Sequence, residues 1–452
     1  MGLRAAYYTL GCKVNQYESE AVANLMVSYG YETVDFSEYA DVYVINTCTV
    51  TGLADRKCRQ IMRRAKGINK EAVVVVMGCY SQVSPDEVAK IKEVDIIIGT
   101  NERKSLPQII EAYCNKYQMS KEPIVRVGSI KDVHEFEELG IDTYNDHTRA
   151  FLKIQDGCDR YCSYCIIPYA RGAVRSREPN NILCDIKELV SKGYKEFVLT
   201  GIHLASYGRD LKNIDLVGII REICKIDGVK RLRLGSIEPM TITQEFVEMV
   251  KSQSKICPHF HISLQSGSDS VLERMNRKYT AKEYLRKCNL LKANISGLAL
   301  TTDIIVGFPG ETAEEFEDTV KFVKKIGFSK IHVFKYSPRK DTPAAKMPHQ
   351  IEPKQKEERS KRLVKISDLA AEVFSAGLKG KEVEVLVEKR LVDNEKKMIY
   401  EGHSENFVKV KFERIIDHSK CCNMENYDLC GEIINVFITG SEQENAQGIM
   451  RE

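Results

Sequence analysis

FLKIQDGCDRYCSYCIIPYARGAVRSR, residues 151–177, is the stretch around which the rest of the chain is organised. Its apolar start predicts a strand, and Asp156-Gly157 predicts a turn at the end of that strand. Three cysteines then follow within eight positions, with no histidine among them: Cys158, Cys162 and Cys165. Thiolates so close together on one loop favour a soft metal, either zinc or an iron–sulfur cluster. Structural zinc takes four ligands and an iron–sulfur cube normally takes four cysteines, so three cysteines would leave one iron open.

The C-x3-C-x2-C spacing, with the aromatic Tyr164 directly before the last cysteine, resembles the motif of the radical S-adenosylmethionine (SAM) enzymes. The resemblance implies that the open iron of a 4Fe-4S cluster chelates the amino and carboxylate groups of SAM. It also implies that an electron from the cluster cleaves SAM to methionine and a 5'-deoxyadenosyl radical, which takes a hydrogen from the substrate. The spacing alone leaves two alternatives open, a zinc knuckle with a remote fourth ligand or three unrelated buried thiols.

Length and composition limit the class of protein. A chain of 452 residues predicts about three domains, and contents of 43% hydrophobic and 29% charged residues are typical of soluble globular proteins. The beginning, MGLRAAYYTLGCKVN, lacks the apolar run of a secretion signal, and no stretch approaches the roughly 20 apolar residues of a membrane span. Fifteen cysteines in such a chain indicate a reducing compartment. We therefore expect a cytoplasmic protein without a membrane partner.

Strand and helix patterns alternate along residues 1–118. Four apolar runs predict strands, with amphipathic segments between them: AAYYTL, DVYVIN, AVVVVM and DIIIGT. This alternation predicts a doubly wound parallel α/β sheet. Each of the first three predicted strands ends in a cysteine, two residues after the quoted run: Cys12, Cys48 and Cys79. Because the carboxyl ends of parallel strands share one edge, we expect these thiols to meet in a metal site there; the alternative is three buried core cysteines.

The N-terminal domain resembles the corresponding module of the radical SAM methylthiotransferases. The similarity lies in the three cysteine motifs GCKVNQYESE, VINTCTVT and MGCYSQ. It implies that Cys12, Cys48 and Cys79 hold a second, auxiliary 4Fe-4S cluster, whose open iron carries the sulfur that enters the product.

The central part of the chain predicts a second type of α/β domain. Residues 119–143 mix acidic residues with few apolar runs and predict a linker. Residues 144–375 contain about six strand–helix units and predict a partial (β/α) barrel, in which site residues come from the carboxyl ends of the strands. The resemblance implies that the SAM pocket is lined by residues of this kind, which are Tyr164, Gly201, Glu238 and Gln265. Each of them could instead be an ordinary turn or strand-end residue.

Three arginines directly follow the three-cysteine loop: Arg171, Arg175 and Arg177. They would either pair with acidic neighbours or bind an RNA phosphate or the carboxylate of a modified base. Lys13, beside Cys12, is a further candidate for contact with such a carboxylate.

Residues 376–441 change to short strands with alternating apolar residues and predict a small antiparallel β-barrel. This domain resembles the TRAM domain, an RNA-binding module. Residues 442–452 are expected to be a frayed tail, and Cys421, Cys422 and Cys430 are expected to be ordinary thiols.

The resemblance covers nearly the whole chain and implies a tRNA methylthiotransferase that uses SAM and two 4Fe-4S clusters. It implies that one SAM methylates a sulfur on the auxiliary cluster and that a second SAM supplies the radical that removes hydrogen from carbon 2 of an adenosine. An aromatic C–H bond has no useful acidity, so cofactor-borne radical chemistry is required. We expect tRNA and an electron donor such as flavodoxin or ferredoxin as partners, and no DNA.

The sequence Gly11-Cys12-Lys13-Val14-Asn15 resembles the branch of the family that acts on N6-threonylcarbamoyladenosine (t6A) at position 37 of tRNA. The isopentenyladenosine branch has glutamine and methionine after this cysteine. The threonyl group carries a carboxylate that Lys13 and the three arginines could pair, so we predict t6A as the substrate. The alternatives are isopentenyladenosine, a ribosomal protein, and a non-catalytic zinc-containing RNA-binding protein.

Overall fold

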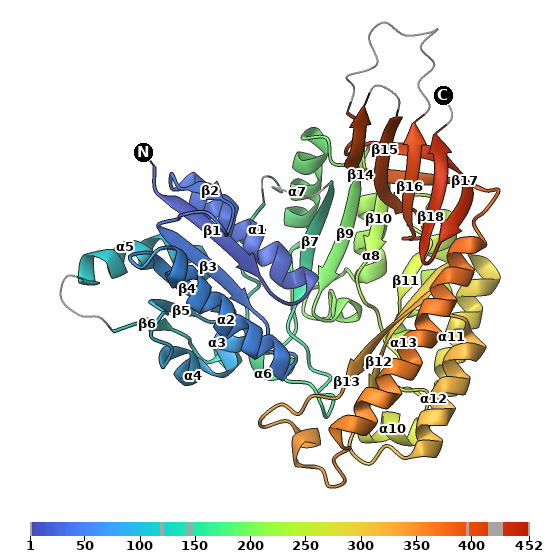
Figure 1. Cartoon of the computed structure of the whole chain (residues 1–452), viewed down its shortest axis with the longest axis horizontal. Coiled ribbons are helices and arrows are strands. Elements are labelled where there is room, and N and C mark those ends of the chain that lie inside the picture. The colour runs from blue at the N-terminus through green and yellow to red at the C-terminus, as the bar shows by residue number, and fades with distance from the viewer. Residues whose placement is uncertain are drawn as a thin grey trace, which may run out of the picture.

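The computed structural model describes residues 2–117, 122–141, 143, 148–394, 397–414 and 428–450. The chain forms three domains, which appear in chain order as blue, green-to-orange and red parts in Figure 1. Cys421 and Cys422 lie outside the described residues, whereas Cys430 packs against the core of the C-terminal domain. Within the described residues, no helix combines the length and the apolar composition needed to cross a membrane.

The N-terminal domain is a parallel α/β sheet with the strand order β2-β1-β3-β4-β5-β6. Its strands are β1 (Arg4–Thr9), β2 (Glu32–Val34), β3 (Val42–Thr47), β4 (Val73–Gly78), β5 (Ile96–Ile98) and β6 (Ile124–Arg126). Its helices are α1 (Lys13–Ser28), α2 (Gly52–Ile68), α3 (Cys79–Val83), α4 (Pro85–Ala89) and α5 (Leu106–Tyr117). The central strands β3, β4 and β5 are almost entirely buried, as in a parallel sheet with helices on both faces, which confirms the predicted fold class. Two short edge strands, β2 and β6, were not predicted, and β6 belongs to the segment predicted as a linker.

The central domain is the predicted partial barrel. Six parallel strands form it: β7 (Arg149–Asp156), β9 (Glu196–Gly201), β10 (Arg231–Leu234), β11 (His259–His261), β12 (Ala299–Val306) and β13 (Lys330–Lys335). Isolated bridges, Leu232 to Ile256 and Ile237 to Ile262, continue the sheet between β10 and β11. The two-residue strand β8 (Arg175–Ser176) pairs antiparallel with the end of β7.

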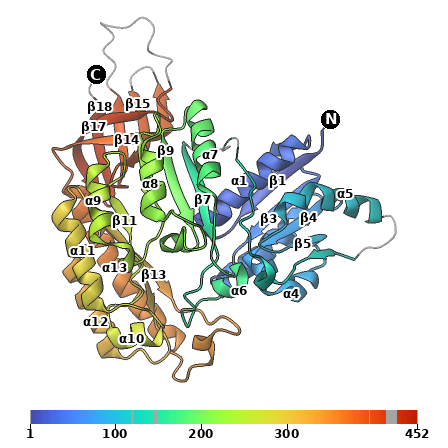
Figure 2. The ribbon, with the colours of Figure 1, turned by 180° about the vertical axis from the view of Figure 1, so that it is seen from behind.

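Helices cover the outer face of the partial barrel (Figure 2). They are α7 (Pro179–Ser191), α8 (Leu216–Cys224), α9 (Gln244–Ser252), α10 (Asp269–Arg274), α11 (Ala281–Asn294), α12 (Ala313–Ile326) and α13 (Pro353–Ala376). The short helix α6 (Ile167–Arg171) instead lies beside α3 of the N-terminal domain. Short 3-10 helices lie at Arg103–Ser105, Ile130–Asp132, Leu204–Ser206, Pro239–Thr241 and Pro343–Lys346. Tyr17 and Ala21 of α1 share one hydrophobic core with the barrel strands, so the N-terminal domain packs directly against the barrel.

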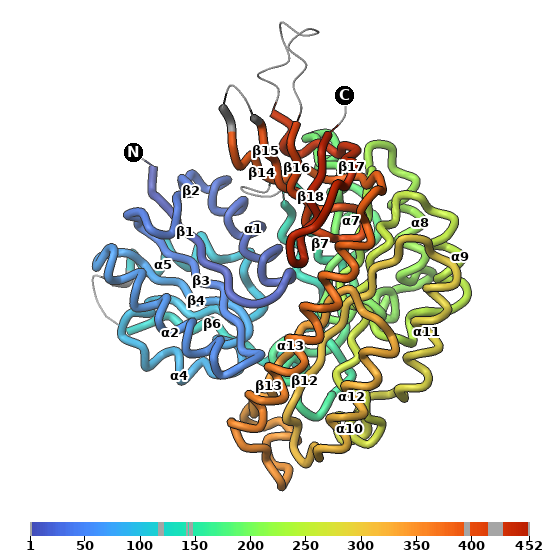
Figure 3. Tube along the Cα trace, turned by 45° about the vertical axis from the view of Figure 1, so that its right-hand side comes forward, coloured from blue at the N-terminus to red at the C-terminus, as the bar shows by residue number. Residues whose placement is uncertain are grey.

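The C-terminal domain is a closed barrel with the order β14-β15-β16-β18-β17. Its strands are β14 (Glu382–Asn394), β15 (Lys397–Ser404), β16 (Lys409–Arg414), β17 (Ile433–Glu442) and β18 (Asn445–Met450). Four neighbouring pairs are antiparallel as predicted, but β16 and β18 are parallel. The prediction of a frayed tail is wrong for residues 445–450, because β18 closes the barrel. Figure 3 shows this domain above the end of α13, beside α1 and the barrel strands.

Removal of residues 443–452 is expected to unfold the C-terminal barrel. β18 pairs with both β16 and β17, and its Ala446 is fully buried, so its loss exposes two strand edges and opens the core. Limited proteolysis should then cut within residues 377–442, whereas a chain lacking only residues 451 and 452 should resist. Equal resistance of both truncated chains would show that β18 is dispensable for closure.

Candidate active site

Cys12, Cys48 and Cys79 lie at the carboxyl edge of the N-terminal sheet, after β1, β3 and β4. Gly11 has φ +114°, and a Cβ at this position would lie 2.9 Å from Cβ and 3.1 Å from Sγ of Cys48. The end of β1 can therefore approach Cys48 so closely only with glycine there. Burial raises the pKa of Cys48 to about 12, and the thiols of Cys79 and Cys12 add to the rise. The structure thus brings these three cysteines together, as predicted from the strand ends.

The second set, Cys158, Cys162 and Cys165, lies on the loop between β7 and α6. Gly157 (φ +73°) begins this loop, and a Cβ there would lie 1.7 Å from the carbonyl oxygen of Ala173, so the tight turn requires glycine. Burial raises the pKa of Cys165 to about 12 and that of Cys158 to about 11, and the Cys162 thiol adds to both shifts. The thiols of this loop are therefore close enough to influence one another's ionisation.

Both donor sets fit an iron–sulfur cluster in their chemistry. Binding requires the cysteines as thiolates. Burial destabilises the thiolates, as the raised pKa values show, and bound iron would restore their stability through its positive charge. Among the described residues, no group of three or more His, Cys, Asp or Glu side chains has the geometry of a single metal-ion site. The thiolates of an iron–sulfur cluster bind different iron atoms, so they do not converge on one point. Within each set, the three cysteines are the residues that would hold such a cluster.

A buried charge network connects the two cysteine sets. Glu18 on α1 is fully buried and contacts three cations: Nζ of Lys153 at 2.7 Å, Nη1 of Arg103 at 2.7 Å and Nη2 of Arg171 at 2.9 Å. Burial alone would raise the pKa of Glu18, but Arg103, Arg171 and Lys153 hold it well below its usual range. Arg171 also donates a hydrogen bond from Nε to Sγ of Cys79 at 3.3 Å. The segment that follows the three-cysteine loop is therefore bonded to a cysteine of the other set.

The three predicted RNA-contacting arginines are all buried, with exposed fractions of 0%, 2% and 1% for Arg171, Arg175 and Arg177. Each pairs with a carboxylate, and these partners are Glu18, Asp156 and Glu138 respectively. The structure therefore corresponds to the alternative of pairing with acidic neighbours. None of the three guanidinium groups is exposed for contact with RNA, and each is already paired with a carboxylate of the protein.

Glu238, predicted to contact SAM, lies just after β10 beside the second cysteine set. Its carboxylate oxygens lie 3.1 Å from Nε2 of His203, 3.2 Å from Nη2 of Arg160 and 3.4 Å from Nη1 of Arg277. Burial alone would raise the pKa of Glu238, but His203, Arg277 and Arg160 hold it at about 2. Arg277 also donates a hydrogen bond to Sγ of Cys162 at 3.4 Å. Glu238 is therefore an ionised group tied to the cysteine loop through Arg277.

The other predicted SAM residues surround the same end of the barrel. Tyr164 is half-buried and packs against an apolar cluster that includes Met275 and Phe308. Gly201 ends β9, and Gln265 adopts φ +72° while its backbone bridges to Ile304 of β12. Their contacts with SAM remain predictions.

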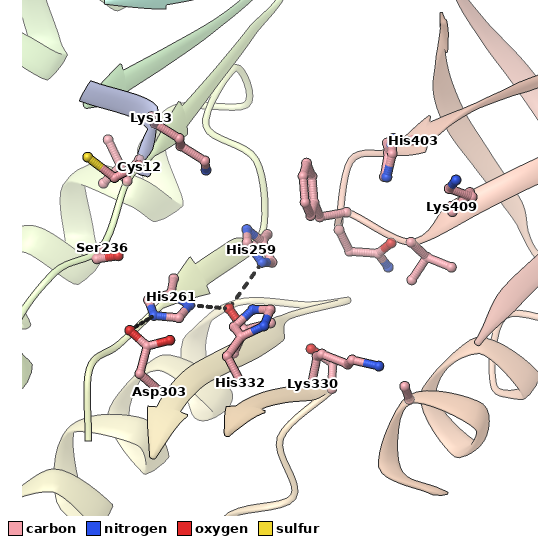
Figure 4. Close-up of a pocket in the computed structure, with 18 of the residues that line it drawn as sticks. Cys12, Lys13, Ser236, His259, His261, Asp303, Lys330, His332, His403 and Lys409 are labelled. Carbon is pink, nitrogen blue, oxygen red and sulfur yellow. Dashed lines mark hydrogen bonds and ion pairs between the residues drawn. The ribbon is translucent and has the colours of Figure 1, made fainter. Parts of the chain in front are cut away.

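A cavity of about 710 Å³ lies where the three domains meet. Residues 11–14, side chains from strands β9 to β13, and residues 403 and 406–409 of the C-terminal barrel line it, and we call it the central cavity. Figure 4 shows Cys12 and Lys13 on one side of the central cavity and His403 and Lys409 on the other. The central cavity therefore connects a cysteine of the first set to the interior of the barrel.

Histidines on the barrel strands form one wall of the central cavity. His261 contacts Oδ2 of Asp303 at 3.1 Å, and Oγ1 of Thr301 lies 3.0 Å from His261 and 3.3 Å from His259 (Figure 4). Burial and the charges of Arg233 and Lys13 lower the pKa of His259 well below its usual range, so this imidazole is neutral. The sequence analysis missed these residues, although histidines two positions apart in a barrel strand share one face.

Lys13 is the lysine of the central cavity that has no ion pair among the described residues. Lys330 pairs with Asp368 and Glu444, and Lys409 pairs with Glu401. The side chain of Lys13 is exposed and lines the open space of the cavity. Partial loss of hydration and the nearby Arg233 and Arg149 lower its pKa to about 8. The wall beside Cys12 therefore carries uncompensated positive charge and suits an anionic group.

The fold and the two cysteine sets define a class of protein, the radical SAM enzymes with an additional N-terminal cysteine site. Residues 152–323 match the radical SAM superfamily, and residues 4–99 match a family described as Uncharacterized protein family UPF0004. A solved structure of the radical SAM methyltransferase TsrM from Kitasatospora setae, with cobalamin and a 4Fe-4S cluster bound, is similar with a TM-score of 0.57. It covers 76% of this chain and 77% of that chain at 16% identity, so it supports the fold alone.

Full-length relatives specify the class further. Threonylcarbamoyladenosine tRNA methylthiotransferase MtaB of Bacillus subtilis (strain 168) is 45% identical over 96% of this chain and 93% of its own length. MtaB of Aquifex aeolicus (strain VF5) is 39% identical over 96% of this chain and 100% of its own length. A tRNA-2-methylthio-N(6)-dimethylallyladenosine synthase of Clostridium novyi (strain NT) is 36% identical over 94% and 95%. The chain belongs to the radical SAM methylthiotransferase family.

Replacement of Glu18 by glutamine is expected to lower the free energy of unfolding by about 3–5 kcal/mol, because buried cations then lose their counter-charge. Bound iron should fall as well, since Arg171 no longer has its carboxylate partner beside Cys79. Denaturant unfolding and iron analysis of anaerobically purified protein measure both effects. Glu38→Gln is the matched control, because Glu38 pairs with Arg4 at the surface, where an ion pair contributes little. Equal stability of the two variants would contradict a structural role for the buried network.

Proposed function

We propose that this protein is a tRNA methylthiotransferase that attaches a methylthio group to carbon 2 of t6A at position 37. The observation that carries the proposal is the central cavity, where Cys12 of the first cysteine set and Lys13 face the interior of the radical SAM barrel. The higher identity to the two MtaB relatives than to the Clostridium novyi relative favours this branch over isopentenyladenosine.

We assign Cys158, Cys162 and Cys165 to the cluster that cleaves SAM, and Cys12, Cys48 and Cys79 to an auxiliary 4Fe-4S cluster. When bound, the first cluster supplies the electron that generates a 5'-deoxyadenosyl radical, and the auxiliary cluster supplies the sulfur. Electrons come from a donor such as flavodoxin or ferredoxin, and the reaction takes place in the cytoplasm on tRNA.

Residues of this chain bind and orient the reactants. The SAM-binding residues that we propose lie around the end of the barrel beside the second cysteine set, and they are Tyr164, Gly201, Glu238 and Gln265. Glu238 suits the amino group of SAM, because it stays ionised and Arg277 fixes it relative to Cys162. The N-terminal domain and the C-terminal barrel enclose the central cavity and limit the access of water to a reactive radical.

Lys13 would bind the carboxylate of the threonyl group. It is unpaired among the described residues, lies one residue from Cys12 and reaches the central cavity. An isopentenyl group is wholly apolar and would offer this cation no charged partner.

The assignment of the two cysteine sets is tested with two triple alanine variants. Loss of Cys158, Cys162 and Cys165 should remove about half of the roughly eight irons expected for two clusters and abolish 5'-deoxyadenosine formation. Loss of Cys12, Cys48 and Cys79 should also halve the iron but retain reductive SAM cleavage, with no methylthio transfer. The measurements are iron analysis and chromatography of the SAM products. SAM cleavage by the first variant, or unchanged iron in the second, would refute the corresponding assignment.

The substrate is tested with reduced enzyme and tRNA that carries either t6A or isopentenyladenosine, followed by digestion and mass spectrometry of the nucleosides. We expect methylthiolation of t6A. Lys13→Met should raise the KM for t6A-containing tRNA about 10- to 100-fold, as expected for loss of a charge-assisted hydrogen bond. Lys409→Met is the matched control, because Lys409 lines the same cavity but pairs with Glu401. Methylthiolation of isopentenyladenosine alone would overturn the substrate and leave the radical chemistry intact.

A further inference from the structure

We propose that Phe407 of the C-terminal barrel is a positioning residue that holds Lys13 in place for recognition of the t6A carboxylate. The C-terminal barrel would then take part in the choice of the modified base, in addition to any contact with the rest of the tRNA. This inference rests on the proposed function. Three observations support it: the conformation of the turn that contains Phe407, the hydrogen bonds between this turn and the radical SAM barrel, and the contacts of the aromatic ring.

The turn between β15 and β16 is rigidly built around Ser404. The Ser404 backbone N–H donates to the carbonyl oxygen of Val408 at 2.9 Å, and the Ser404 hydroxyl lies 2.6 Å from Oδ1 of Asn406. Ser404 and Asn406 are buried, with exposed fractions of 0% and 4%. Phe407 adopts φ +65°, which is strained for a bulky residue and favours glycine or asparagine. An aromatic residue at such a position indicates that its side chain has a role that offsets the backbone strain.

Two arginines of β10 bind this turn to the radical SAM barrel. Arg233 donates to the carbonyl oxygens of Ser404 at 2.7 Å and Glu405 at 2.8 Å, and Arg231 donates to that of His403 at 3.4 Å. Both arginines also pair with the buried Glu196 of β9. The turn therefore has a fixed place at the central cavity.

The ring of Phe407 lies among positively charged and aromatic side chains from all three domains. Its centroid is 4.9 Å from Cζ of Arg233, 5.5 Å from Cζ of Arg149 and 5.9 Å from Nζ of Lys13. His403 stacks on it at 4.7 Å, and His259 lies 5.0 Å away. The negative face of an aromatic ring attracts cations within about 6 Å. The ring therefore offsets repulsion among three like charges and holds the ammonium group of Lys13 at the central cavity.

Without the ring, the Lys13 ammonium would face Arg149 and Arg233, whose repulsion exceeds the attraction of Glu196. Glu196 and Glu388 compensate the two arginines, whereas Lys13 has no such partner among the described residues. The long lysine side chain would then turn away from the arginines and leave the position that suits a carboxylate. Phe407 thus acts on the substrate through Lys13.

The test compares the affinities of full-length protein, reconstituted with both clusters, for two anticodon stem-loops that carry either t6A or unmodified adenosine at position 37. Fluorescence anisotropy gives the ratio of the two Kd values for each variant. Phe407→Leu and Phe407→Asn both remove the ring, and asparagine also suits the positive φ. Either should reduce the preference for t6A about fivefold, within the range of a desolvated cation–π interaction. Phe407→Tyr keeps the aromatic face and should retain the preference of the unaltered protein.

A double variant separates positioning from general damage. In a Lys13→Met background, Phe407→Leu should change the Kd ratio less than twofold, because interacting residues are not additive. Phe36→Leu is the control, since Phe36 holds Arg64 in a similar contact at 5.7 Å and neither residue lines the cavity, so this variant should leave the ratio unchanged. An unchanged ratio in a soluble ring-less variant, or equal effects of Phe407→Leu with and without Lys13, would overturn the inference. An unaltered protein without any preference for t6A would instead refute the proposed substrate.

Discussion

The structure depends on the buried contacts of Glu18 with Lys153, Arg103 and Arg171. A carboxylate with no exposed surface is stable only if cations surround it, and here those cations come from both sides of a domain boundary. Lys153 belongs to the strand before the three-cysteine loop, and Arg171 belongs to the helix after it. The same arginine donates to Cys79 of the other cysteine set. One electrostatic constraint therefore aligns two cysteine sites from different domains, which is the arrangement that the proposed reaction requires.

Electrostatics also explains why the C-terminal barrel belongs to the site. Arg231 and Arg233 project from the radical SAM barrel and donate to backbone oxygens of the turn at residues 403–405. Backbone carbonyls accept hydrogen bonds whatever the side chains of the turn are. The contact therefore depends on the backbone path of the turn. The C-terminal barrel is thus held at the central cavity, and the aromatic ring of its Phe407 contacts Lys13 of the N-terminal domain.

Local sequence patterns predicted the helices and strands better than they predicted which distant residues contact one another. The apolar runs gave all the core strands, and their ends located the six cysteines, because strand period and turn residues are local properties. The sequence could not decide between acidic partners and RNA for Arg171, Arg175 and Arg177, because the carboxylates that pair with them are brought close only by the fold. The short strands β6 and β18 were missed because few residues define them, and their pairing comes from the finished sheet and barrel. The role of Phe407 was also invisible, because its neighbours come from three domains.

The central claim is that this chain converts t6A to its 2-methylthio form in tRNA. Mass spectrometry of nucleosides from total tRNA, prepared from cells with and without the gene for this protein, tests it most directly. The account predicts that 2-methylthio-t6A disappears without the protein, that t6A accumulates in its place, and that a plasmid copy restores the modified base. An unchanged level of 2-methylthio-t6A in cells that lack the protein would contradict it.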